Sequence, residues 1–108
     1  MDDPVRPREL SRELHAIWTR HLPGTVASID CIGDAGRAIL FGELDDAKRA
    51  AAVECAHQLV GVSAAYGCRE LAQLARDAER LLTGDVATGN GRLLVALANR
   101  MNAALDLG

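Results

Sequence analysis

The stretch DDAKRAAAVECAHQLVGVSAAYG, residues 45–67, decides the fold because it has the pattern of one amphipathic helix between two turn signals. Asp45 or Asp46 can accept a hydrogen bond from the free N–H groups of a first helical turn, and Gly67 can end the helix. Apolar and small residues recur along one face at helical spacing. This predicted core stripe consists of Ala52, Ala56, Leu59, Ser63 and Tyr66. We therefore expect a helix that runs to about Ala65.

Beyond Gly67, a second stripe predicts another helix, which must double back after so short a turn. Its members are Leu71, Leu74, Ala75, Ala78 and Leu82. The stretch TGDVATGNG, residues 83–91, is rich in turn residues and is predicted to be a loop. A last helix is predicted to follow this loop. Its stripe consists of Leu94, Leu97, Met101 and Leu105.

Before residue 45, we expect a flexible segment over residues 1–7 and then a long first helix, since Pro7 suits a first helical turn. Its stripe begins with Leu10, Leu14 and Ile17. Pro23 interrupts the pattern, but apolar spacing resumes after it, which favours a Pro-kinked continuation over a loop. Gly33 and Gly36 argue against a helix here. Gly42 can take a positive φ in the turn that follows.

Four amphipathic segments with short joints predict an all-α fold, an antiparallel up-down four-helix bundle. The 108 residues suffice for one domain with one core, so we expect a single domain over residues 1–108. Hydrophobic residues make up 49% of the chain but include only three aromatic side chains, which predicts a core of aliphatic residues and alanine.

Composition also excludes several classes of function. The net charge of −3 is spread along the chain, which disfavours nucleic acid and anionic membranes as partners. No apolar run approaches the roughly 20 residues that span a bilayer. The three cysteines form no C-x-x-C pair and no signal-peptide pattern precedes them, so we expect reduced thiols, a cytoplasmic protein and no metal site.

The stretch AHQLVGVSAAYGCREL, residues 56–71, resembles the signature of histidine phosphotransfer (HPt) domains, the phosphoryl carriers of two-component phosphorelays. The family pattern is H-x-L-K-G-x-S, followed at fixed offsets by Gly and Leu. The matching positions are His57, Leu59, Gly61, Ser63, Gly67 and Leu71. The stretches ELHAIWTRHLP and LARDAERLL also resemble the first and third helices of bacterial members. The resemblance implies that His57 accepts a phosphoryl group.

The residues themselves support this interpretation. His57 falls beside the core stripe, where an imidazole would be exposed in the middle of a helix. Gly61 lies one turn further on, and a glycine inside a helix suggests that something approaches closely. We therefore predict a docking surface for a receiver domain. It comprises Val60, Gly61, Ala64 and Arg76.

Glu79 is the candidate partner of the histidine. It lies 22 residues after His57, and antiparallel helices hinged near Gly67 would bring it alongside. In HPt domains, Glu or Gln at this spacing contacts the active histidine. Such a contact at Nδ1 would fix the tautomer, leave Nε2 free to react and stabilise positive charge on the ring.

Val60 departs from the family, which usually has lysine at that position. Arg76 or a basic residue of the partner could supply the missing charge. The resemblance implies a carrier without its own cofactor rather than an enzyme, and an isolated bundle of this size can be monomeric. Its partners would be a response-regulator receiver domain, which would hold the Mg²⁺, or a histidine kinase.

Two alternatives stay open at this stage. The first is a degenerate HPt-like module that docks a kinase or receiver without transferring phosphate, as Val60 suggests. The second is a helix-turn-helix DNA-binding protein with a turn at Gly61–Ser63 and a recognition helix from about Ala64, which would offer Arg69 and Arg76 to the major groove.

Overall fold

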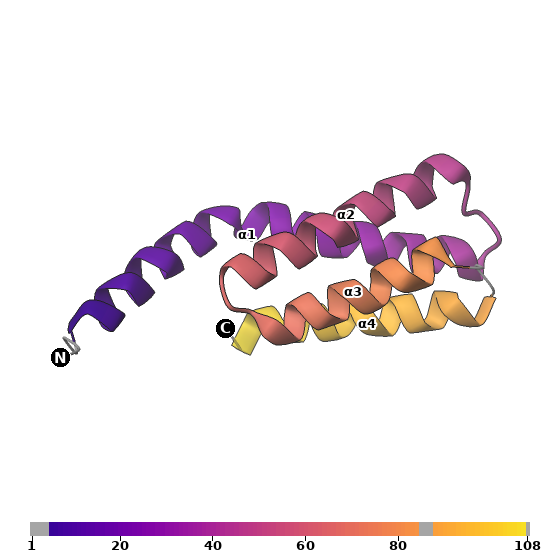
Figure 1. The fold of residues 1–108 in the computed structure, drawn as a ribbon. Coiled ribbons are helices and arrows are strands. Elements are labelled where there is room, and N and C mark those ends of the chain that lie inside the picture. The colour runs from indigo at the N-terminus through magenta and orange to yellow at the C-terminus, as the bar shows by residue number, and fades with distance from the viewer. Residues whose placement is uncertain (1–4, 85–87, 108) are drawn as a thin grey trace.

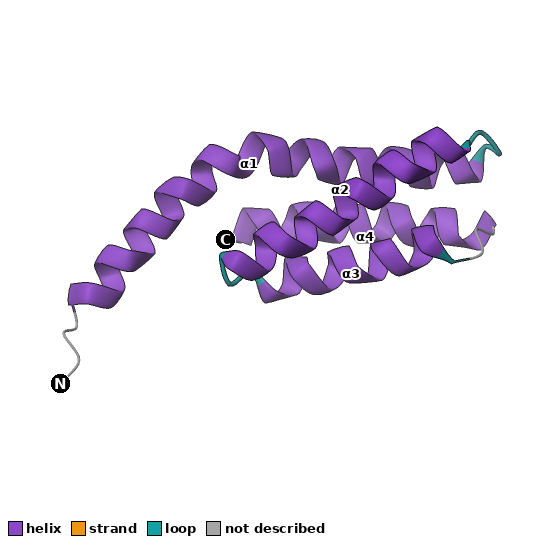
Figure 2. Ribbon diagram, turned by 45° about the horizontal axis from the view of Figure 1, so that its top comes forward, coloured by secondary structure: helices purple, strands orange, loops and turns teal. Residues whose placement is uncertain are grey.

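The protein is an antiparallel bundle of four helices, described here from a computed structural model covering residues 5–84 and 88–107 (Figure 1). The helices are α1 (Val5–Leu40), α2 (Asp46–Ala65), α3 (Arg69–Thr83) and α4 (Thr88–Leu107). Helix α1 packs against α4 and α2, and α3 packs against α2 and α4. Only short loops join the helices in the described part of the chain (Figure 2). The predicted all-α, up-down architecture is confirmed.

Helix α1 is continuous through Pro23, as the resumed apolar pattern predicted. Its 36 residues correspond to about 54 Å of helix, close to the 57 Å length of the molecule. The N-terminal part of α1 projects beyond the other helices, and the helix changes direction before it joins the bundle (Figure 1). Among the described residues, those of α1 that pack in the core begin at Leu22, and the apolar Ile17 before them is 38% exposed.

Two helix boundaries differ from the prediction. Helix α1 begins at Val5, inside the segment 1–7 that was expected to precede it, since a proline is tolerated in a first turn. Helix α4 begins at Thr88, so the predicted loop over residues 83–91 is shorter than expected. Residues 1–4 and 85–87 of these predicted segments lie outside the described residues.

The core follows the stripes read from the sequence. In α2, four of the five stripe residues are buried, and Tyr66 is half-buried at the helix end. All five predicted residues of α3 are buried, as are Leu94, Leu97 and Met101 of α4. Small alanines at these positions let the helices approach closely, while aliphatic side chains fill the space between them.

Local signals define both ends of α2. Asp45 is the N-cap residue, and its carboxylate accepts a hydrogen bond from the backbone N–H of Lys48 at 2.7 Å. Gly42 and Gly67 take positive φ angles of 67° and 73° in the turns on either side, as glycine readily does. Arg49 ties α2 to the end of α3, because its guanidinium donates to the carbonyl oxygens of Leu82 and Gly84 at 2.6 Å each.

The backbones of α1 and α4 touch at a pair of glycines. A Cβ atom on Gly91 would lie 2.7 Å from the carbonyl oxygen of Gly36, and one on Gly36 would lie 2.9 Å from that of Gly91. Both distances are too short for a side chain. Packing against α1 therefore explains why α4 includes Gly91, which the sequence assigned to a loop, and why Gly36 belongs to a helix despite its low propensity.

Candidate functional site

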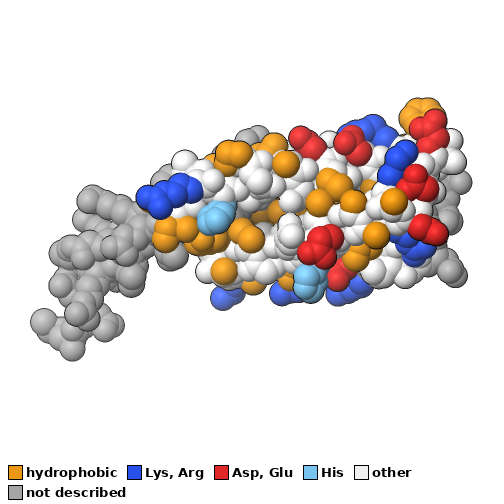
Figure 3. Space-filling view, turned by 90° about the horizontal axis from the view of Figure 1, so that it is seen from above, with side chains coloured by type: hydrophobic (Ala, Val, Ile, Leu, Met, Phe, Trp, Pro, Cys, Tyr) orange, Lys and Arg blue, Asp and Glu red, His pale blue; other side chains and the backbone are white. Residues whose placement is uncertain are grey.

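His57 lies in the middle of α2 on the side that faces α3, next to the buried Ala56. Its side chain is 71% exposed, so most of the imidazole ring is open to solvent. In the view of Figure 3, one histidine side chain reaches the molecular surface directly beside acidic side chains. A helix anchored by core residues on its other face holds this ring on a rigid support.

Glu79 of α3 lies beside His57. Its Oε1 atom is 3.4 Å from Nδ1 of the imidazole, and its side chain is 31% exposed. The tight turn at Gly67 sets this register, because α2 and α3 run antiparallel from it. With Nδ1 directed at the carboxylate, the opposite edge of the ring, which carries Nε2, is the one left for an incoming group.

The four residues of the predicted docking surface do not share one environment. Gly61, Ala64 and Arg76 are exposed, whereas Val60 is half-buried and packs against the core. A Cβ atom on Gly61 would have no atom within 4 Å. Packing among the described residues therefore does not require glycine at position 61, and the space above it is open to another molecule.

The structure excludes the helix-turn-helix interpretation. Helix α2 runs unbroken from Asp46 to Ala65, so Gly61 and Ser63 lie inside a helix and form no turn. The chain turns instead at Tyr66–Cys68, where Gly67 has its positive φ. A recognition helix beginning near Ala64 is therefore wrong, because that residue belongs to the end of α2.

Ser63 is a core residue. It is fully buried, and its hydroxyl has no hydrogen-bond partner among the described residues. Its side chain lies on the opposite side of α2 from the exposed Gly61 and cannot meet an incoming group at the surface. Ser63 therefore plays no direct part in chemistry at His57.

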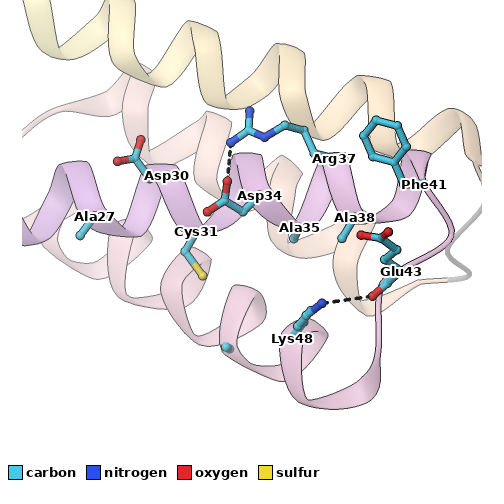
Figure 4. A pocket seen from close by; sticks show the side chains of 11 residues that line it. Ala27, Asp30, Cys31, Asp34, Ala35, Arg37, Ala38, Phe41, Glu43 and Lys48 are labelled. Carbon is cyan, nitrogen blue, oxygen red and sulfur yellow. Dashed lines mark hydrogen bonds and ion pairs between the residues drawn. The ribbon is translucent and has the colours of Figure 1, made fainter.

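A groove of about 610 Å³ between α1 and α2 lies apart from His57 (Figure 4). Alanines and Cys31 form its floor, charged residues stand around it, and the 74% exposed Phe41 lies at one end. The Cys31 thiol points toward α2 and interacts there with the side chain of Cys55. The sequence did not predict this pairing, because residues 31 and 55 share no motif spacing.

Burial raises the pKa of the Cys31 thiol from 9.0 to about 11, and its hydrogen bond with Cys55 and the nearby Asp34 carboxylate act in the same direction. Only the thiolate reacts with iodoacetamide. We expect the rate of Cys31 alkylation, measured by mass spectrometry, to increase about tenfold per pH unit from pH 8 to 10. The protonated Cys31 thiol contributes to the free energy of unfolding, and this contribution should be lost as the pH rises from 9 toward 11.

The denatured chain provides the control for this measurement. There the rate at Cys31 should level off just above pH 9, as for an ordinary thiol. The same plateau in the folded protein would show that burial does not protect this thiol.

The described residues contain no group of three or more histidine, cysteine or acidic side chains placed to bind a metal ion. None of the helices in this part of the chain combines the length and the hydropathy needed to cross a membrane.

In a comparison with models of known families, residues 27–107 match the Hpt domain. The matched region comprises α2, α3, all of α4 and residues 27–40 of α1. No curated protein and no solved structure matches the chain.

Proposed function

The chain belongs to the Hpt domain family, as the motif around His57 predicted, and we propose that it relays a phosphoryl group on this histidine between partner proteins. The observation that carries the proposal is the exposed imidazole of His57 with its Nδ1 atom 3.4 Å from the Glu79 carboxylate. This arrangement suits a carrier, because it orients the ring and leaves one nitrogen accessible.

In the proposed reaction, neutral His57 keeps its proton on Nδ1, toward Glu79. The lone pair of Nε2 attacks the phosphorus of an aspartyl phosphate on a receiver domain. The bond between phosphorus and the aspartyl oxygen breaks, and its electron pair returns to the carboxylate as the phosphoryl group moves to Nε2. The ring gains positive charge in this step, and the Glu79 carboxylate stabilises it. The reverse step passes the group to another receiver.

The partner would approach over α2 and the adjacent face of α3. The open surface at Gly61 and Ala64 would allow a receiver's active site to come close to His57. The receiver would bring its own Mg²⁺ and aspartate, and a histidine kinase could be the original donor. We place this relay in the cytoplasm, in accordance with the reduced cysteines expected from the sequence.

We expect Glu79→Ala to slow phosphoryl transfer to His57 by about 10-fold, because the ring loses the group that orients it. Glu79→Gln should lie between this variant and the wild type, since the amide oxygen can accept a hydrogen bond from Nδ1–H but carries no charge. Quenched-flow transfer from a phosphorylated receiver measures the rates, and circular dichroism checks that the bundle is intact. If both variants transfer at the wild-type rate, Glu79 is not part of the site.

Val60 favours a second candidate, a module that docks receivers or kinases without accepting phosphate. Incubation of the wild-type protein with ³²P-labelled receiver distinguishes the phosphoryl carrier from the docking-only module. A carrier takes up label that is stable to alkali and labile to acid, as expected for phosphohistidine. A docking-only module binds the receiver, as calorimetry would detect, but remains unlabelled.

A further inference from the structure

The proposed transfer step places a phosphoryl group beside a residue that cannot neutralise it. The group carries negative charge on its oxygens, and a nearby cation or hydrogen-bond donor lowers the barrier for its transfer. Val60, one turn beyond His57, offers neither, and it is half-buried against the core. A cation for this step must therefore come from another position.

The contact between His57 and Glu79 fixes which residue of α3 lies opposite position 60. Val60 is three residues beyond His57, or about 4.5 Å further along α2. Because α3 runs in the opposite direction, three residues back from Glu79 give the same displacement. That residue is Arg76. Arg76 thus lies at the level of Val60, across the seam between the two helices.

Arg76 is also available to bind an incoming group. It is exposed and takes part in none of the ion pairs found among the described residues. Arg80, in contrast, lies 3.8 Å from the Asp77 carboxylate, and Arg49 is bound to carbonyl oxygens at the end of α3. Arg69 is ten residues from Glu79, about 15 Å away along the helix.

We propose that the Arg76 guanidinium binds the phosphoryl oxygens at His57 Nε2 and takes over the task that a lysine at position 60 would perform. The inference rests on the proposed phosphotransfer function. Arginine suits this task because it stays charged at any physiological pH and its planar group can donate two parallel hydrogen bonds to one phosphoryl group. The phosphoryl group would then lie on the exposed edge of the His57 ring, with the Glu79 carboxylate at the Nδ1 edge and the long Arg76 side chain reaching the phosphoryl oxygens from α3.

The test compares Arg76→Ala with Arg80→Ala, which removes the same charge from the next exposed arginine of α3. At saturating phosphorylated receiver, we expect Arg76→Ala to lower the transfer rate on the order of 10- to 100-fold, and Arg80→Ala to stay within about twofold of the wild type. Adding Val60→Lys to Arg76→Ala should restore most of the rate, because it returns a cation to the same level of the seam.

Three outcomes would overturn the inference. The first is an Arg76→Ala rate equal to that of the wild type. The second is a change only in the receiver concentration at half-saturation, which would make Arg76 a docking residue alone. The third is an equal loss in Arg80→Ala, which would indicate a general effect of charge. If the wild-type protein itself accepts no label, the proposed function fails instead, so the two failures are distinguishable.

Discussion

Replacing His57 with glutamine will reduce phosphoryl uptake from a labelled receiver to the background level measured in a reaction that lacks this protein. Glutamine has a similar size and polarity, but its amide nitrogen has no free lone pair to attack phosphorus. Because the His57 side chain is 71% exposed, the substitution should change the free energy of unfolding by no more than about 0.5 kcal/mol. The label is measured after separation of the two proteins, and a thermal melt confirms the fold.

His21→Gln is the matched control. His21 is another exposed histidine, on α1, whose ring centroid lies 6.2 Å from that of Tyr66, and it has no place in the proposed site. This variant should take up as much label as the wild type. Uptake by His57→Gln equal to that of the His21 variant would assign the phosphoryl group to some other residue.

Replacing Gly91 with alanine will destabilise the bundle by about 2 kcal/mol. The added Cβ would lie 2.7 Å from the carbonyl oxygen of Gly36, so α1 and α4 must move apart along their contact. This cost exceeds the gain of up to about 1 kcal/mol that alanine brings to a helix. For a domain of this size, the melting temperature should fall by roughly 10 °C.

Gly89→Ala is the control for this substitution. Gly89 lies in the same first turns of α4, but a Cβ atom there would have no atom within 4 Å. Alanine at position 89 should therefore leave the stability unchanged or raise it by up to about 1 kcal/mol. Equal unfolding free energies for the two variants, measured in urea, would contradict the close approach of α1 and α4.

The core of this fold was predictable because each helix carries its buried residues at regular spacing. The stripe through Ala56 and Leu59 located α2, and the glycine at position 67 located the turn into α3. Together they predicted that Glu79 lies beside His57, since the short turn allows few registers between the helices. This part of the site depends on local sequence and could be inferred from it.

Contacts between helices distant in the sequence could not be inferred in this way. Gly91 looked like a loop residue, because its helical state depends on packing against Gly36, 55 positions earlier. The proximity of Cys31 and Cys55 has the same origin. Each depends on how two helices lie against each other, which spacing within one helix does not determine.

The most direct test of the central proposal is to determine which nitrogen becomes phosphorylated. The protein labelled with ¹⁵N-histidine is mixed with phosphorylated receiver, and the histidine side-chain nitrogens are observed by NMR. We predict that one imidazole, assigned to His57 by comparison with His57→Gln, acquires phosphorus on Nε2 while Nδ1 stays unmodified. Phosphorylation at Nδ1, at another residue, or at no histidine despite binding of the receiver would contradict the proposal.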